Sequence, residues 1–243
     1  MMRRIRPRQD HPHVPETNPM PHRKLPAMAA AVVVVSLSAT AAVAAPEMAK
    51  KFGGPKPNET VSMLPEGQDN PMIAEGVAIG ANTAIYKSSG LGPAAKNAAA
   101  PAGSEERYID TDIFPGGELP AGVTITEAQG INALARIGEN LERAGLTYDD
   151  VITMRVFLQN PDGEEQMDFA GWNRAYRQYF ANTSLATGEP VPVRLGTAAP
   201  AEPLVVNPAR PSRFALEIEN LPVDGWLVEV EVDAAYPSSA GGK

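Results

Sequence analysis

Two charged side chains in the C-terminal third of this sequence have the type and the setting for chemistry on a small acid. Arg213 follows a Pro-x step at the start of a predicted strand, and its planar guanidinium group can bind a carboxylate through two parallel hydrogen bonds. Glu229 lies in a later predicted strand, and a carboxyl group with a raised pKa can transfer protons during a hydrolysis. The two residues therefore offer one group for binding and one for proton transfer.

Each of these residues also has a purely structural interpretation. An arginine at a strand start is often a surface residue that pairs with a nearby carboxylate. Glu229 shares its strand face with Glu231 and Asp233, and a row of carboxylates is often plain solvated surface. Nothing in the local sequence distinguishes Glu229 from Glu231, so from the residues alone both interpretations stay open.

Three further positions could contribute to a substrate site. Asn173 lies on an otherwise apolar and aromatic face of a predicted helix, where it could bind a substrate, orient Arg213 or satisfy a backbone group. Ser89 and Gly90 could offer a hydroxyl group and a close backbone N–H, although a strand-ending turn is the default explanation of such a pair. The aromatic residues of the same helix, such as Tyr176, are expected in the core or an interface.

The residue types that are missing narrow the chemistry further. The sequence has no cysteine, and its three histidines, His11, His13 and His22, all lie in the first 45 residues. The rest of the chain therefore lacks thiol and imidazole groups, which excludes a cysteine nucleophile, a Ser-His-Asp triad and the usual zinc ligand sets. We expect no metal and no cofactor.

The distribution of charge bears on the partners. The first 45 residues hold six of the 21 basic residues and two of the 29 acidic ones, which leaves a net charge of about −12 on the rest. An acidic body without a basic stripe argues against nucleic acid as a partner and against an anionic membrane surface. A small anion stays compatible, because one well-placed arginine can outweigh the general field locally.

Residues 1–45 are typical of an export signal with an N-terminal extension. A basic stretch precedes an apolar, alanine-rich run, and small residues follow at Ala42, Ala44 and Ala45. The run is short for a bilayer span, and no cysteine follows it that could carry a lipid anchor. We expect cleavage after Ala44 or Ala45, a periplasmic location and no membrane association afterwards.

The remaining pattern predicts one α+β domain over residues 70–236, after an irregular segment at 46–69 and before a polar tail at 237–243. Its order of elements, ββαβαββ, predicts a mixed sheet with both helices on one face. The expected elements are paired strands at 77–80 and 84–89, a long loop at 91–123, a helix from Thr124 or Thr126 to about 144, a strand at 151–158, a helix at 165–180, a Pro-rich loop at 186–212, and strands at 213–219 and 227–233.

Five motifs in this order resemble the RidA (YjgF-like) reactive-intermediate deaminase family. They are the Ser89-Gly90 pair, a V-F-L strand at 156–158, an N-x-x-Y-x-x-Y-F helix from Asn173, a P-x-R strand start at Arg213, and a V-E-V-E strand around Glu229. The resemblance covers about residues 70–236. It implies a chorismate-mutase-like fold and a homotrimer with sites in clefts between subunits.

The resemblance also implies an activity. Members of this family hydrolyse enamines and imines of 2-keto acids to the keto acid and ammonia, and some members bind ligands without that activity. By this resemblance Arg213 binds the carboxylate, Glu229 activates water, and Asn173, Ser89 and Gly90 complete the substrate site.

We therefore expect an exported homotrimeric deaminase of 2-enamino or 2-imino acids. The alternative is a non-catalytic protein that binds small carboxylate metabolites, and a third class is a structural or chaperone-like trimer. The sequence departs from the family pattern at Ile73, where the family often has tyrosine, and in the longer Pro-rich stretch at 186–210. Both departures are expected to reshape the pocket.

We predict that the mature protein begins at Ala45 or Pro46 and lies outside the cytoplasm, because a signal segment of this kind is removed during export. N-terminal sequencing of the protein from fractionated cells of its native host checks this. An intact terminus at Met1 or Met20 in the cytosolic fraction would contradict it.

Overall fold

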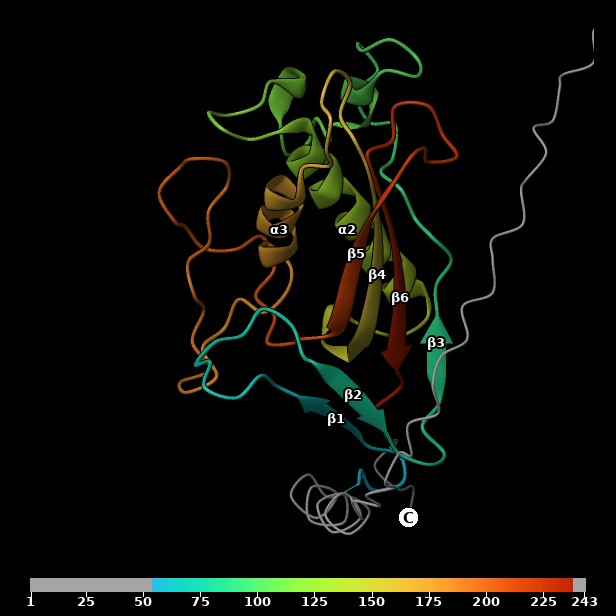
Figure 1. Cartoon of the computed structure of the whole chain (residues 1–243), viewed down its shortest axis with the longest axis vertical. Coiled ribbons are helices and arrows are strands. Elements are labelled where there is room, and N and C mark those ends of the chain that lie inside the picture. The colour runs from blue at the N-terminus through green and yellow to red at the C-terminus, as the bar shows by residue number, and fades with distance from the viewer. Residues whose placement is uncertain (1–53, 238–243) are drawn as a thin grey trace, which may run out of the picture. The chain divides into compact units, whose positions relative to one another are not determined.

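The computed structural model describes residues 54–237, and Figure 1 shows their helices and strands. The signal segment predicted over 1–45 and nearly all of the polar tail predicted over 237–243 lie outside these residues. Among the described residues, no helix combines the length and apolar character that crossing a membrane requires. The elements in chain order are β1 (Thr60–Met63), β2 (Gly76–Ile79), β3 (Ile85–Lys87), α2 (Ile125–Arg143), β4 (Val151–Gln159), α3 (Phe169–Arg177), β5 (Ser212–Ile218) and β6 (Val228–Ala235).

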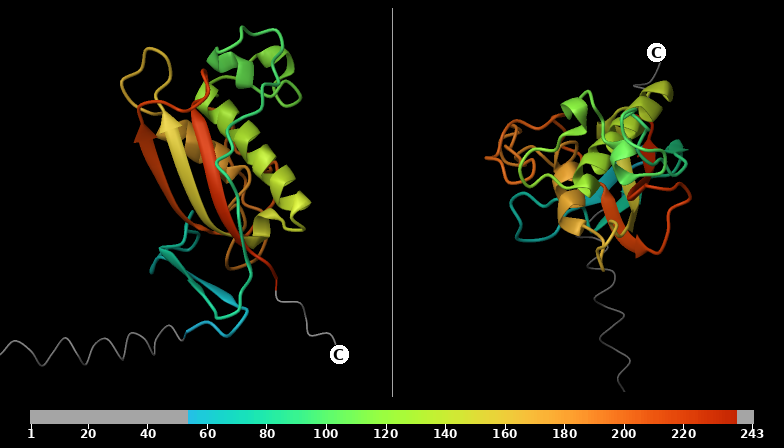
Figure 2. Two further views of the ribbon diagram at one scale, coloured as in Figure 1. Left: turned by 90° about the vertical axis from the view of Figure 1, so that its right-hand side faces the viewer. Right: turned by 90° about the horizontal axis from the view of Figure 1, so that it is seen from above.

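The main sheet has four strands in the order β3-β6-β4-β5. β4 runs parallel to β5 and antiparallel to β6, so the sheet is mixed, as the sequence predicts. Alternation along the inner strands buries Met154, Val156, Val230 and Val232 completely on one face. Both helices pack on that face (Figure 2), which confirms the predicted α+β architecture.

α2 follows the sequence prediction closely at both ends. The Thr124 side chain accepts a hydrogen bond from the N–H of Glu127 (3.1 Å), a cap that stabilises a helix by about 1 kcal/mol. At the other end, Gly145 takes the left-handed conformation with φ +75°, which favours glycine. The apolar residues between them, including Ile131 and Leu134, are fully buried against the sheet.

The long loop predicted at 91–123 is held on α2 by buried amide side chains. Asn132 accepts from the N–H of Ala94 (3.0 Å) and donates to the same residue's carbonyl oxygen (2.9 Å). Gln129 accepts from the N–H of Leu227 (2.7 Å), just before β6. Buried backbone groups that do not pair within a sheet need such hydrogen-bond partners. The two amide side chains of α2 therefore fix the chain at Ala94 and at Leu227, which is not helical, against this helix.

The predicted pairing of the strands at 77–80 and 84–89 is wrong. β2 pairs with β1, which lies in the segment predicted to be irregular, and β3 pairs with β6 from the far end of the chain. Runs of three or four residues carry little information about their partner, because packing against the rest of the sheet decides the pairing.

The second helix is shorter than the predicted 165–180. The Asp168 side chain accepts from the N–H of Gly171 (2.8 Å) and so begins α3 at Phe169. The helix ends at Arg177, and Ala181 takes a left-handed conformation with φ +54° shortly afterwards. The aromatic residues Tyr179 and Phe180 lie in the turn after the helix, and they are buried there. The spacing of aromatic residues in the sequence therefore extends beyond the end of the helix.

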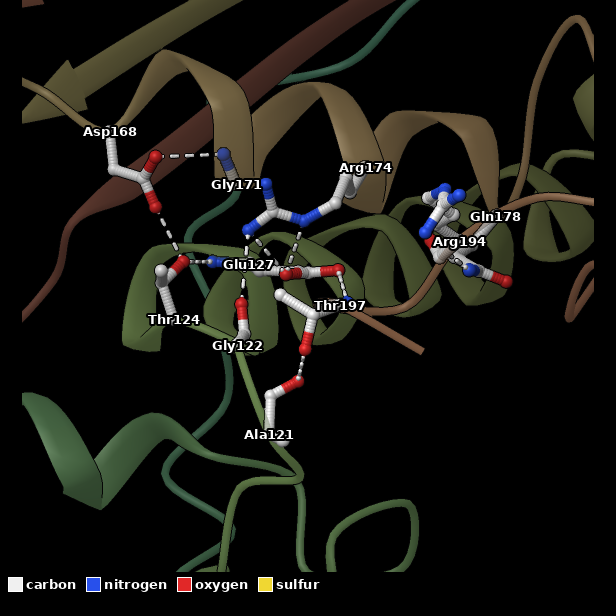
Figure 3. A network of polar contacts seen from close by, with 11 residues as sticks. Ala121, Gly122, Thr124, Glu127, Asp168, Gly171, Arg174, Gln178, Arg194 and Thr197 are labelled. Atoms are coloured by element: carbon white, nitrogen blue, oxygen red, sulfur yellow. Dashed lines mark hydrogen bonds and ion pairs between the residues drawn. The ribbon is translucent and has the colours of Figure 1, made fainter. Parts of the chain in front are cut away.

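A buried ion pair connects both helices to the Pro-rich loop (Figure 3). The side chain of Glu127 is fully buried, and one of its oxygens accepts from Arg174 Nε at 2.8 Å, with Nη2 also 2.8 Å away. The other oxygen accepts from the N–H of Gly196 (3.0 Å). A Cβ at position 196 would lie 2.5 Å from the carbonyl oxygen of Ala121, so only glycine fits this close approach.

We predict that Arg174→Met lowers the free energy of unfolding by about 3 kcal/mol, because it leaves the Glu127 carboxylate buried without its main partner. Arg174→Met combined with Glu127→Leu should cost less than the sum of the two single changes, because the pair is lost only once. Denaturant unfolding of the four proteins measures this coupling. Arg143→Met, at an exposed site on α2, is the matched control. Additive losses would contradict the proposed role of the pair.

Candidate functional site

Arg213 lies on the helix-facing side of β5 and reaches α3. Its Nη2 donates a hydrogen bond to Asn173 Oδ1 (2.8 Å), and its guanidinium lies over the ring of Tyr176, 4.3 Å from the ring centre. The ring is itself fixed, because the Tyr176 hydroxyl donates to the carbonyl oxygen of Met72 (2.8 Å). The structure therefore brings together two of the predicted site residues, Arg213 and Asn173.

The charge of Arg213 has no counter-ion in the described part of the chain. None of the ion pairs among residues 54–237 involves it, and its Nη1 is buried without a hydrogen-bond partner there. Burial lowers the pKa of Arg213, and the neighbouring Tyr176 partly offsets this. A buried, unpaired guanidinium is unfavourable. The oxygens of a carboxylate ligand would supply both the charge and the missing acceptor.

Glu229 lies on the other face of the sheet. On β4, Glu229 is paired with Phe157, whereas Arg213 is paired with Met154. Residues that are paired on neighbouring strands point to the same face of the sheet. Met154 faces the helices, and Phe157, an odd number of positions away, faces away from them. One chain therefore does not bring Arg213 and Glu229 together.

The remaining predicted residues, Ser89 and Gly90, lie next to Glu229. The chain after β3 stays paired with β6, since Leu91 and Val230 exchange backbone hydrogen bonds of 2.9 and 3.0 Å. A Cβ at position 90 would overlap the Glu229 carboxyl group in its present position, so the two groups lie in direct contact. Ser89 is exposed beside it. The five predicted residues thus form two groups, Arg213 with Asn173 and Glu229 with Ser89 and Gly90.

The structure distinguishes Glu229 from its neighbour Glu231, which the sequence does not. Glu231 lies 2.6 Å from Lys87 Nζ and 3.5 Å from Arg155 Nη1. No ion pair within residues 54–237 involves Glu229. Burial, together with the negative charge of Glu231, raises the pKa of Glu229. Glu229 is therefore the carboxyl group of this face that is better suited to accept and return a proton.

Tyr176 and two further arginines belong to the same region, and the sequence interpretation did not assign them a role. Tyr176 is fully buried, as expected for a core residue, but it also carries the Arg213 guanidinium on its face. Arg177 and Arg210 lie close enough to Tyr176 to act on it electrostatically, like Arg213. The sequence feature that indicates these arginines is their number at 174–177 and 210–213, since neither segment contains an acidic residue that could pair with them.

The two departures from the family pattern lie near the Arg213 group. Ile73 packs against the core next to Met72, and part of the Pro-rich stretch lines a groove of about 370 Å³ that Asn173 also borders. Within residues 54–237, no cluster of three or more acidic or histidine side chains could hold a metal ion.

A family model described as Endoribonuclease L-PSP matches residues 115–236. Among solved structures, YyfB of the Rid family from Yersinia pestis is 18% identical with a TM-score of 0.39, and the alignment covers 73% of this chain and 98% of that one. E. coli TdcF, solved with bound serine, is 20% identical with a TM-score of 0.36, covering 70% and 95%. The E. coli YjgF gene product is 21% identical with a TM-score of 0.35, covering 72% and 92%. A comparison with curated proteins found no significant match.

Proposed function

The chain belongs to the RidA (YjgF-like) family, and on that premise we propose that it hydrolyses 2-enamino and 2-imino acids to the 2-keto acid and ammonia. The observation that carries this proposal is the Arg213 guanidinium, which lies partly buried over Tyr176, is oriented by Asn173 and has no counter-ion in the described chain. A 2-imino acid offers the carboxylate that this group lacks.

The reaction needs a water molecule and a group that moves protons. Glu229 takes a proton from water as the water oxygen bonds to the imine carbon. Glu229 gives this proton to the imine nitrogen. It then takes the second proton from the new hydroxyl group and passes it to the nitrogen as the carbon–nitrogen bond breaks, so that the hydroxyl oxygen becomes the carbonyl of the keto acid and ammonia leaves. The raised pKa of Glu229 suits it to both halves of this transfer. An enamine substrate first takes up a proton at carbon to become the imine.

We place this chemistry between two copies of the chain. Within one copy, Arg213 and Glu229 lie on opposite faces of the sheet, so a complete site needs Arg213 and Asn173 from one copy and Glu229 with Ser89 and Gly90 from another. β5, which carries Arg213, is an outer strand of the sheet. On the Glu229 face, Phe214 and Leu216 are 46% and 48% exposed, and these apolar side chains offer a surface for the second copy.

RNA is a less suitable substrate, although the family model is described as an endoribonuclease. The chain after residue 45 carries a net charge of about −12 and has no histidine, whereas RNA binding relies on neutralising phosphates with basic residues. We also propose that the protein acts outside the cytoplasm, on the strength of the signal segment at 1–45.

The alternative is a protein that binds small carboxylates without catalysis. It uses the same Arg213 site, and Glu229 is then one of several carboxylates on a polar strand. Release of ammonia from freshly generated 2-iminopropanoate separates the two functions, and binding of pyruvate without ammonia release would favour the alternative.

We predict that Arg213→Lys weakens ligand binding, whereas Glu229→Gln slows turnover. The lysine keeps the charge but loses the planar fork, so pyruvate should bind roughly 10- to 150-fold more weakly. The glutamine keeps the shape but cannot carry the proton, so turnover of 2-iminopropanoate should fall by ~10²–10⁴ while pyruvate binding changes little. Calorimetry and ammonia detection measure the two effects.

Glu231→Gln is the matched control for the glutamate, because it changes the same side chain on the same strand face. It should leave turnover within about tenfold of the parent, because it removes the charge of Glu231 but not the burial of Glu229, which is the larger cause of the raised pKa of Glu229. If both site variants behave like the parent, the site lies elsewhere.

We predict that the protein is a homotrimer at micromolar concentration and that Leu216→Glu dissociates it, because a charge cannot be buried unpaired in an interface. Sedimentation velocity measures the mass, and ammonia release should disappear with the trimer. Leu185→Glu, at a site of similar exposure (46%) away from the sheet, should leave the trimer intact. A monomeric parent would contradict the prediction.

A further inference from the structure

The groove beside Asn173 is lined by arginines and by no carboxylate. It has a volume of about 370 Å³ and lies between α3 and the 192–200 part of the Pro-rich stretch. Asn173 is shared between this groove and the Arg213 site, because it borders the groove and accepts from Arg213 Nη2. The residues that line the groove are Met72, Asn173, Arg174, Arg177, Pro192, Val193, Arg194 and Pro200.

Two of the three positive charges of the groove have no ion-pair partner within residues 54–237. Of its three arginines, only Arg174 forms an ion pair there, with the buried Glu127. None of the ion pairs among residues 54–237 involves Arg177 or Arg194. Arg210 adds a further charge near Arg177, and its own guanidinium donates only to backbone carbonyl groups. Guanidinium groups without a counter-ion have the donors that the oxygens of an anion accept from.

Figure 3 shows how the arginines divide. Arg174 points toward Glu127. Arg194, in the Pro-rich stretch, lies next to Gln178, the residue that follows α3, and the Gln178 Nε2 donates a hydrogen bond to the Arg194 carbonyl oxygen (3.1 Å). Asn173 and Arg177 are four residues apart on α3, so they share a face about one helical turn apart. This separation is one that the carbon chain of a small dicarboxylic acid can span.

We propose that Arg177 and Arg194 bind a second, distal carboxylate of the substrate whose first carboxylate binds at Arg213, so that the preferred substrates are imines of 2-oxo dicarboxylic acids. This proposal rests on the proposed function and names its substrate class. The Pro-rich stretch that makes one wall of the groove is the part of the sequence that is longer than the family pattern. The preference is therefore a property of this chain rather than of the fold.

The test compares two ligands that differ only at the distal end. Calorimetry of the full protein with 2-oxopentanoate and 2-oxoglutarate should show that the dicarboxylate binds at least about tenfold more tightly. Arg177→Gln and Arg194→Gln should each remove most of this difference and leave the affinity for 2-oxopentanoate unchanged. Arg143→Gln, which removes the same charge at an exposed site on α2, should change neither affinity.

The outcomes separate the groove from the Arg213 site. Equal affinities of the parent for both ligands overturn the proposal, and so does a preference that survives both groove variants. If Arg213→Lys weakens both ligands but the groove variants weaken neither, the proposed function stands and the groove has no role. If the groove variants remove the preference while Arg213→Lys changes nothing, the groove binds anions and the proposed site is wrong. Arg194 is exposed, so its variant tests the groove even if Arg177→Gln fails to fold.

Discussion

One buried carboxylate, Glu127 of α2, joins the two parts of the chain that form the walls of the groove, α3 and the Pro-rich stretch. Its oxygens meet a guanidinium from α3 and a backbone N–H from the Pro-rich stretch. A carboxylate without solvent is unfavourable unless its oxygens have partners, so the burial of Glu127 favours the arrangement in which α2, α3 and the chain at Gly196 meet. The Pro-rich stretch has only isolated backbone bridges, such as the one between Val193 and Ala201, and the contact with Glu127 is one of several that position it. Because the same contact occupies Arg174, the arginines that remain for a ligand are Arg177 and Arg194.

The alternation of side chains along the strands sets a second constraint. Arg213 and Glu229 are in register with β4 residues three positions apart, an odd number, and the sheet therefore separates them. No change of rotamer brings them to one side. A role for both in one reaction thus requires a second copy, and the exposed Phe214 and Leu216 lie on the face where that copy would have to pack. The proposed assembly of copies and the proposed catalytic roles of Arg213 and Glu229 therefore depend on each other.

The sequence predicts the long, strongly periodic elements well and the short ones poorly. α2 is capped by Thr124, one of the two caps that the sequence offers (the other is Thr126), and it ends where the apolar spacing predicts. The pairing of β2 and β3 is wrong, because partners for such short strands come from distant parts of the chain. In the site, the contact between Arg213 and Asn173 follows from residues that the sequence already singles out. Their separation from Glu229 does not, because it depends on the register of β5 against β4. The hydrophobic pattern of β5 is no guide to that register, since its apolar residues Phe214 and Leu216 face away from the helices.

The same chain keeps its cations paired in one place and unpaired in another. On the Glu229 face, Lys87 and Arg155 are neutralised by Glu231 and Asp233. Around α3, the charges of Arg177, Arg194 and Arg213 have no such partners in the described residues. The negative net charge of the protein repels an anion at long range. Salt screens this repulsion beyond about 8 Å. At hydrogen-bond distance in a partly buried groove, the nearest guanidinium groups dominate instead. The negative net charge of the protein is therefore compatible with the proposed binding of a dianion at a place where unpaired arginines converge.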